Sequence, residues 1–331
     1  VPASAARPSL LRFLFGFLRH STQRSWQRAM GQLVGINRLA LESFDLLGDG
    51  GVTAPTHPAQ SFIAAWRTPA ERRTLLAELD HIRAAGQPME HEVLTGDQAR
   101  EIEPLLSDRI GAAVLLRGQR FVDPGQYVHA LADAVRDRGG AIVTDTEVQT
   151  VEESGSGVVV GGHHADAVVL ATGAWLGKLA RPYGIRRVVQ AGRGYSFSVP
   201  VTTLPHGPVY LPAARVACTP IGDRLRVAGM MEFRRPEAPM DPRRISAIVE
   251  AARPLLSGVD LDGRRDEWVG SRPCTSDGLA LIGATRSPRV YVAGGHGMWG
   301  ITLGPATGRL LAEQIATGHV PEALRPFDPL R

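Results

Sequence analysis

The sequence predicts a mixed fold, α/β in one part of the chain and α+β in another. Helical and strand-like segments alternate over 121–190 and again over 273–331, which is the pattern of an α/β domain. Residues 187–269 instead hold strand-like runs such as Gly194–Val199 and Leu225–Met231, which predict an antiparallel sheet. The 331 residues, 44% of them apolar, suffice for two domains with separate cores.

The first 47 residues predict two helices, over Ser9–His20 and Ser25–Leu47, because apolar residues recur at helical spacing. Leu10–Leu18 is the most apolar run, but Arg12 interrupts it and it is too short to span a bilayer. Two interpretations of this run stay open: a buried or interdomain helix, and a peripheral contact with the inner face of a membrane.

The middle of the chain indicates a change from α+β to α/β structure. Residues 48–120 combine polar turns with a helical stretch over Arg67–Ala85 and a Gly96–Leu105 segment, which predicts a mixed region. Asp123–Arg138 predicts a helix. Three strands are expected after it, over Ala141–Val151, Gly157–Gly161 and Ala167–Leu170.

The last sixth of the chain predicts a strand, a glycine loop and a helix. Arg289–Ala293 is a short β-branched and aromatic run, and the glycines from Gly294 to Gly300 let the backbone approach a ligand closely. A helix follows, with Pro305 in its first turn and Gly318 at its end. Free N–H groups at the helix start therefore predict an anion-stabilising site.

Composition argues against several other classes of protein. The net charge is +4 and the pI is about 9.5, but the basic residues are scattered arginines and Lys178 is the only lysine; nucleic-acid binding is therefore not expected. Cys218 and Cys274 are too few and too far apart for a disulfide framework or a CxxC site. With no metal-ligand motif, no metal is expected. A reduced, cytoplasmic chain is the default expectation.

Several motifs together resemble one family. Arg272–Gly278 reads RPCTSDG, and Leu281–Gly283 and the GHGMWGITLGPATG segment ending at Gly308 follow in order. These residues resemble the FAD-dependent D-amino-acid oxidase and dehydrogenase family, most closely its bacterial D-amino-acid dehydrogenase branch, and are similar to glycine oxidase. Further landmarks are Phe121–Tyr127, Gly139–Val143 with Val148, Val168–Trp175, Arg193–Tyr195 and Leu225–Glu232.

The resemblance implies two domains and a reaction. A Rossmann-like FAD-binding domain would comprise 1–48, 121–190 and 273–331, and a discontinuous antiparallel-sheet substrate domain would comprise 49–120 and 191–272. The implied reaction is oxidative deamination of a D-amino acid, with hydride transfer from Cα to flavin N5, giving a 2-oxo acid and ammonia. A quinone or oxygen would then accept the electrons. The oligomeric state is left open.

The resemblance also implies site residues. Arg272 would clamp the substrate carboxylate; otherwise it forms a surface ion pair. Tyr210 and Tyr195 would line the pocket or pack in the core. Met298 stands where glycine-oxidase-like members carry a second substrate-binding arginine, which argues against glycine as substrate. Met298 and Trp299 would either line an apolar side-chain pocket or be ordinary packing residues. Cofactor contacts are assigned to Val148, Thr172, Gly173, His296, Gly297, Met298, Trp299, Gly300, Ile301 and Thr302.

Two of these assignments have ordinary structural alternatives. Val148, expected against the adenine, is equally a core valine, and Thr172–Gly173 is equally an ordinary strand-to-helix turn.

The family's N-terminal GxGxxG unit is not found in the sequence. We expect roughly fifty residues, one βα unit with its second strand, to precede Val1, and the FAD-binding domain to lack its first βαβ unit in this chain. The purified chain is accordingly expected to hold little FAD. Two alternatives stay open: an inactive remnant or subunit that does not bind FAD by itself, and a glycine- or sarcosine-type amine oxidase.

Overall fold

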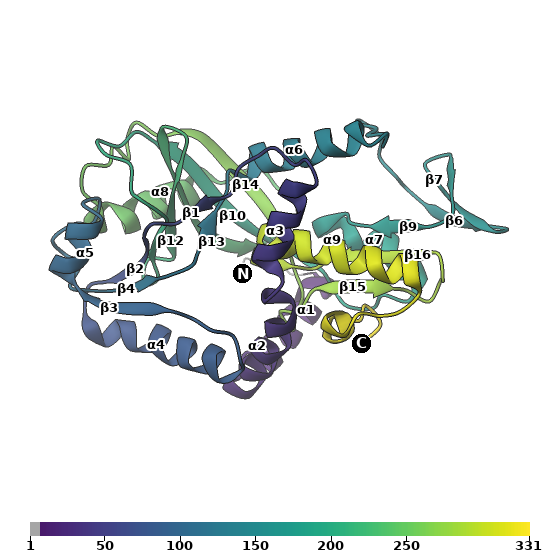
Figure 1. Cartoon of the computed structure of the whole chain (residues 1–331), viewed down its shortest axis with the longest axis horizontal. Helices are drawn as coiled ribbons and strands as arrows, with labels where there is room; N and C mark the ends of the chain where they lie inside the picture. The colour runs from purple at the N-terminus through teal and green to yellow at the C-terminus, as the bar shows by residue number, and fades with distance from the viewer. Residues whose placement is uncertain (1–6) are drawn as a thin grey trace.

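An eight-stranded sheet dominates the computed structural model, which describes residues 7–331 (Figure 1). Its strand order is β14-β10-β13-β12-β11-β2-β4-β3, and every neighbouring pair is antiparallel except β11 with β2. The sheet therefore draws its strands from two separate stretches of sequence. In chain order the strands are β2 (Phe62–Trp66), β3 (His91–Thr95), β4 (Ala112–Leu116), β10 (Gln190–Val199), β11 (Val209–Leu211), β12 (Val216–Ile221), β13 (Arg224–Phe233) and β14 (Arg265–Cys274).

Three smaller sheets complete the strand inventory of residues 7–331. β9 (Val168–Leu170) pairs in parallel with β16 (Val290–Gly294), which pairs antiparallel with β15 (Leu281–Ala284). A separate meander projects from the molecule on the right of Figure 1. It consists of β6 (Val151–Ser154), β7 (Gly157–Val160) and β8 (His163–Ala165), while β1 (His57–Pro58) pairs with β5 (Arg120–Phe121).

Two of the five hydrophobic clusters among the described residues position the site. One face of the large sheet, including Tyr195, Phe197 and Val227, packs with Ile245 and Ile248 of α8. A second core joins α2, α9 and β15. The helices are α1 (Pro8–His20), α2 (Gln23–Asn37), α3 (Ala40–Asp49), α4 (Pro69–Ala84), α5 (Gly96–Ile102), α6 (Pro124–Asp137), α7 (Leu176–Ala180), α8 (Pro242–Ala252) and α9 (Gly300–Thr317), with 3-10 turns η2 (Gly173–Trp175), η3 (Arg181–Tyr183), η4 (Arg253–Leu255), η5 (Gly297–Trp299) and η6 (Glu322–Phe327).

Helix ends follow local sequence chemistry. The Asp123 carboxylate accepts from the N–H groups of Gly125 and Gln126 at the start of α6, directly before Pro124. Thr68 and Glu71 form a capping box at the start of α4. The helices predicted over Asp123–Arg138 and Arg67–Ala85 are therefore confirmed within one or two residues.

The single helix predicted over Ser25–Leu47 was wrong. It is two helices, α2 and α3, with a break at Arg38–Leu39 where the Leu39 N–H bonds the Ile36 carbonyl at 3.1 Å. Both halves contact α9, but α2 also contacts α4 and η6, so the neighbours of the two halves differ in part. Tertiary packing, which periodicity does not report, imposes the break.

The strand predicted over Ala141–Val151 was also wrong. Residues 140–150 form no regular structure, and β6 begins only at Val151. Within residues 7–331 no strand lies beside this segment to complete a ladder, and the Val143 side chain is 61% exposed. In contrast, strands were predicted correctly at β7, β9, β10, β13 and β16.

Pro305 occupies a different position from the predicted one. Because α9 already begins at Gly300, Pro305 lies in the second helical turn rather than the first. Its missing N–H leaves the Ile301 carbonyl without the usual helical donor. Over residues 7–331, no helix combines the length and the apolar character needed to cross a bilayer.

Candidate functional site

Glycines on β10 form the floor of the candidate site. Gly192 is paired with Arg272 of β14, and Gly194 is paired with Gly270. A Cβ added to Gly194 would overlap Nη1, Nη2 and Cζ of Arg272, so the guanidinium lies directly on the Gly194 backbone. A Cβ on Gly270 would likewise overlap the Trp268 ring. Strands β10 and β14 therefore need glycine at Gly194 and Gly270, because the flat Arg272 and Trp268 side chains cover these positions.

On this face of the sheet, Arg272 has a hydrogen-bond donor without a partner. Its Nη1 is buried without a hydrogen-bond partner, and among residues 7–331 its guanidinium forms no ion pair. Burial lowers the pKa of Arg272, yet a guanidinium stays protonated at any physiological pH. Because buried donors in proteins are nearly always paired, this geometry leaves room for an acceptor supplied from outside.

A second arginine on the same face, Arg226, differs from Arg272 because its donors have partners. Arg226 donates to Ser196 Oγ at 2.8 Å, to Ser198 Oγ at 3.0 Å and to the Asp266 carbonyl at 2.9 Å. Its donors are used within the chain, so Arg226 supports the sheet. Arg272 is the one of the two that is available for a ligand.

The glycine loop meets the end of β14. Cys274, two residues beyond Arg272, forms an antiparallel bridge with His296. Gly295 and Gly297 have φ angles of +74° and +56°, which a side chain would strain, and η5 and α9 follow. The bridge thus brings the start of α9 to the strand end that carries Arg272.

His296 anchors this loop in an uncharged state. Its Nε2 lies 2.9 Å from Thr307 Oγ1 of α9. Burial lowers the pKa of His296 to about 4, so the ring is neutral at pH 7. The loop therefore adds no positive charge of its own beside Arg272.

The end of β9 reaches the same region. Leu170 pairs with Val292 of β16, and Thr172 and Gly173 follow, the latter with φ +55°. The η2 turn contacts β14, and the Trp175 Nε1–H donates to Glu237 Oε1 at 2.6 Å. Three segments remote in sequence, namely β14, η2 and η5, therefore converge.

The predicted site residues divide into two groups. Arg272, Thr172, Gly173 and the His296–Thr302 run lie in the convergent region. The side chains of Met298 and Trp299 are 63% and 49% exposed, which argues against simple core packing and leaves both open to a ligand.

Val148 and the two tyrosines lie elsewhere. Val148 is in the irregular 140–150 segment, beside Gly161. Tyr210, on β11, is four strands from β14, about 19 Å at the usual strand spacing. Tyr195 is fully buried, on the opposite face of the sheet from Arg272.

Sequence reasoning missed Gly194, Trp268 and Met231 as members of the site. Met231 Sδ lies 3.2 Å from the position of a Cβ on Gly192, on the face that carries Arg272, and the side chain is 37% exposed. The repeat Gly192-x-Gly194 opposite an arginine was the available signal, since glycine at alternate strand positions marks close approach.

Comparison with known proteins identifies the family. The model of the family described as "FAD dependent oxidoreductase" matches residues 6–314. The chain belongs to this family. It is 30% identical over 326 residues to the D-amino acid dehydrogenase of Cereibacter sphaeroides (strain ATCC 17029 / ATH 2.4.9), covering 94% of this chain and 73% of that protein. It is 31% identical to the D-amino acid dehydrogenase of Methylobacterium sp. (strain 4-46), covering 95% and 77%.

Solved structures agree with this membership of the FAD-dependent oxidoreductase family. Glycine oxidase from Geobacillus kaustophilus superposes with a TM-score of 0.79 at 26% identity, covering 89% of this chain and 82% of that one. L-proline dehydrogenase from P. horikoshii, at 20% identity and a TM-score of 0.72, shares the fold. Mixed α/β architecture, oxidoreductase class and FAD as cofactor, all predicted from the sequence, are confirmed.

The residues present fit the cofactor's demands. A flat ring system needs backbone that side chains do not obstruct, and Gly173, Gly297 and Gly300 present backbone over which an added Cβ would meet nothing within 4 Å. The N-terminal turn of α9 is exposed, and the first N–H groups of a helix generally lack intrahelical partners and favour negative charge. Arg272 supplies a cation beside them.

Proposed function

We propose that the chain catalyses FAD-dependent oxidative deamination of a D-amino acid to a 2-oxo acid and ammonia. The buried, unpartnered Nη1 of Arg272 carries this proposal, because a carboxylate matches the planar arginine fork with two parallel hydrogen bonds. The names of the relatives from Cereibacter and Methylobacterium support it.

Arg272 would hold the substrate's α-carboxylate. The guanidinium lies directly on the Gly194 backbone, so the strand limits the directions from which a carboxylate can bind it. Holding a reactant in this way contributes much of the rate, because the entropy of alignment is lost on binding rather than during reaction. The amine enters neutral, its lone pair forms the C=N bond as hydride leaves Cα, and water then hydrolyses the imine.

FAD, when bound, supplies the two-electron acceptor for that hydride. The Thr172–Gly173 turn and the His296–Thr302 run would contact its ring system, and Val148 would contact its adenine end. The N–H groups at the start of α9 would stabilise negative charge on the pyrimidine side of the ring. The neutral His296 ring, bonded to Thr307, holds that loop in place.

Apolar walls favour an apolar substrate side chain. Met298, Met231 and Trp268 are all exposed around the Arg272 face, and none carries a charge that would bind a second polar group. We therefore propose a D-amino acid with an apolar side chain rather than glycine or sarcosine. Steady-state rates with D-leucine, D-methionine, glycine and sarcosine rank these candidates.

Kinetics of Arg272→Ala test the proposal in protein supplied with FAD. The variant should raise KM for the amino acid and lower kcat/KM by about 100-fold, since a bidentate charge-assisted pair contributes roughly 3 kcal/mol. Arg117→Ala is the matched control, because Arg117 makes only an exposed ion pair with Glu92 at 2.9 Å. Unchanged kinetics in Arg272→Ala would remove the residue from the site.

The domain assignment is part of the same proposal. Residues 1–48, 121–190 and 273–331 would form the FAD-binding domain, and 49–120 with 191–272 the substrate domain. The eight-stranded sheet supports the second assignment, since its strands fall between 62 and 116 and between 190 and 274. Reoxidation by a quinone or by oxygen is distinguished by measuring oxygen consumption against reduction of a soluble quinone.

We also propose that α1 contacts an anionic membrane surface. Leu11, Phe15 and Leu18 form a stripe at helical spacing and are 57%, 70% and 70% exposed. An adjoining hollow of about 430 Å³ is lined by five arginines, of which Arg187 and Arg331 pair with Asp277 and the other three are Arg12, Arg19 and Arg186. An exposed apolar stripe beside clustered arginines suits acyl chains beneath anionic headgroups.

Vesicle sedimentation tests the membrane contact. The chain should co-sediment with phosphatidylglycerol vesicles and much less with phosphatidylcholine vesicles, and Phe15→Ser/Leu18→Ser should abolish the difference. Val93→Ser, an exposed apolar position on β3, is the control. Equal sedimentation of all three proteins with both vesicles would contradict the contact.

A further inference from the structure

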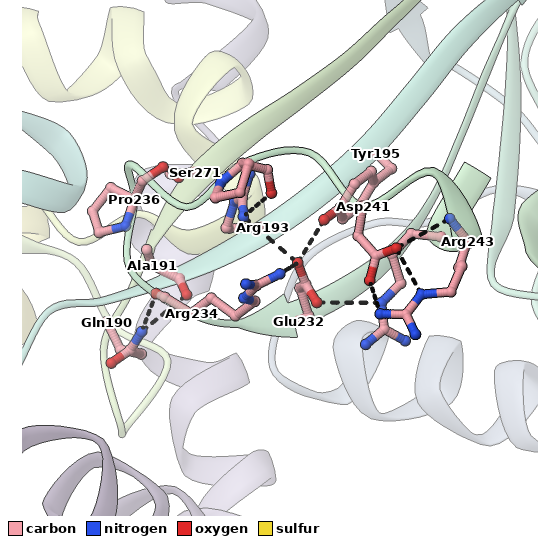
Figure 2. A network of polar contacts seen from close by, with 12 residues as sticks. Gln190, Ala191, Arg193, Tyr195, Glu232, Arg234, Pro236, Asp241, Arg243 and Ser271 are labelled. Atoms are coloured by element: carbon pink, nitrogen blue, oxygen red, sulfur yellow. Dashed lines mark hydrogen bonds and ion pairs between the residues drawn. The ribbon is translucent and has the colours of Figure 1, made fainter. Parts of the chain in front are cut away.

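A buried charged cluster lies on the reverse face of the sheet from Arg272. At its centre, the Glu232 carboxylate of β13 accepts a 2.5 Å hydrogen bond from the Tyr195 hydroxyl (Figure 2). Three arginines pair with the same carboxylate: Arg193 Nη1 at 3.7 Å, Arg234 Nη1 at 3.7 Å and Arg244 Nε at 3.2 Å. Glu232 is therefore the one acceptor that joins β10, β13 and the start of α8.

The centre of the cluster is deeply buried, while Arg234 and Arg244 at its rim are 38% and 42% exposed. The side chains of Arg193 and Glu232 are 1% and 9% exposed. Arg193 Nη1 also donates to the Pro239 carbonyl at 3.2 Å, which fixes the loop after β13. Removing the carboxylate would leave the buried Arg193 guanidinium without its charged partner, which is strongly unfavourable, whereas water screens the more exposed Arg234 and Arg244.

A β-bulge lies beside the cluster and opposite Gly194. Arg193 pairs with Glu232, but Tyr195 pairs with Gly229, so β13 has one extra residue between these pairs. Met230, within the bulge, has φ +63°, a left-handed conformation that a side-chain-bearing residue rarely adopts. Such a conformation persists only where the surroundings hold it in place.

We propose that Glu232 is a positioning residue for Arg272. Its bonds to Tyr195 and Arg193 flank the bulge and hold β10 and β13 in their shifted register. The bulge turns Met231 toward the substrate face and lies opposite Gly194. Gly194 is also the residue of β10 on which the Arg272 guanidinium of β14 lies, so the bulge supports the backbone beneath that guanidinium. This inference rests on the proposed function only in assuming that Arg272 binds a carboxylate.

A positioning role for Glu232 and a general contribution to stability predict different effects on ligand binding. If the bulge relaxes, the Arg272 guanidinium is no longer held in position on Gly194, and binding of a carboxylate weakens. A neutral ligand of the same shape makes no bidentate pair with Arg272, so its binding depends little on that position. The ratio of the two affinities therefore reports positioning, whereas loss of overall stability would lower both together.

The experiment compares benzoate with benzamide, using the full chain supplied with FAD. Dissociation constants come from tryptophan fluorescence and unfolding temperatures from circular dichroism. In Glu232→Gln, benzoate affinity should fall about tenfold and benzamide affinity less than twofold. Tyr195→Phe, which removes a single hydrogen bond to Glu232, should lower benzoate affinity about threefold. Glu92→Gln, which breaks the exposed pair with Arg117, should change neither.

Each outcome is decisive. If both variants keep the wild-type preference for benzoate, or lose both ligands equally, Glu232 does not position Arg272. Should Glu232→Gln fail to fold, the Tyr195→Phe ratio decides alone. If Arg272→Ala binds benzoate as well as wild type does, the proposed function fails instead, and that result is recognisable before any Glu232 variant is measured.

Discussion

Replacing Gly194 with alanine tests the substrate clamp without removing any functional group. Gly194 does not have a left-handed φ, so alanine costs little in backbone conformation. The added Cβ would, however, overlap three atoms of the Arg272 guanidinium, which must leave its seat. Arg272 itself remains in the protein, so the change isolates the placement of the charge.

The expected size of the effect follows from the hydrogen bonds between Arg272 and the substrate carboxylate. A hydrogen bond to a charged partner contributes about 1.5–3 kcal/mol, and a displaced guanidinium forfeits at least one of two, so a loss of about 1.5–3 kcal/mol is expected. That corresponds to a roughly 10- to 100-fold lower kcat/KM for a D-amino acid. Unfolding temperature should change less than activity, because alanine fits the backbone conformation of Gly194 and Arg272 is only partly buried.

The assay is steady-state kinetics on FAD-supplemented protein beside a matched glycine variant. Gly31→Ala is the control, because a Cβ there meets nothing within 4 Å and Gly31 lies within α2. It should leave kcat/KM unchanged and stabilise the helix by about 0.5–1 kcal/mol. If Gly194→Ala keeps kcat/KM within twofold of wild type, the guanidinium does not need its glycine seat and the reasoning fails.

Two further predictions concern the glycine loop. Because burial lowers the pKa of His296 to about 4, the folded protein keeps the ring neutral while the unfolded chain protonates below about pH 6.5. Its contribution to stability is therefore complete above about pH 6.5 and is lost as pH falls toward 4, by up to about 3 kcal/mol. Urea unfolding of wild type and His296→Gln at pH 7 and pH 4.5 checks this: the stability difference should shrink at the lower pH, and a constant difference would contradict it. Met298→Arg should lower kcat/KM for D-leucine about tenfold and raise it for glycine, and equal changes for both substrates would show that Met298 does not select the side chain.

Local chemistry made much of the fold predictable. The α6 helix follows from Asp123, Pro124 and the apolar periodicity, all within a few residues of one another. Strands β10 and β13 were recognisable because their β-branched and aromatic residues are bounded by turn residues.

Long-range packing decided what sequence could not predict. The break at Arg38–Leu39 depends on the neighbours of α2 and α3, and the 140–150 segment depends on whether a strand lies beside it. Periodicity describes one element at a time and contains neither fact.

The candidate site was likewise predictable only where its residues belong to a local sequence motif. Arg272 and the His296–Thr302 run were found through motif resemblance, since their order along the chain is preserved. The Glu232 cluster combines residues up to 51 positions apart, from Arg193 to Arg244, and the bulge at Met230 exists only in the register of two strands. Both require the three-dimensional structure.

Anaerobic reduction of bound flavin by single enantiomers tests the central claim most directly. The proposed function predicts that FAD-supplemented protein bleaches when a D-amino acid with an apolar side chain is added and remains oxidised with the L-enantiomer. Arg272→Ala should lose most of this bleaching at the same substrate concentration. Equal bleaching by both enantiomers, or none with any D-amino acid in protein shown to hold FAD, would contradict the account.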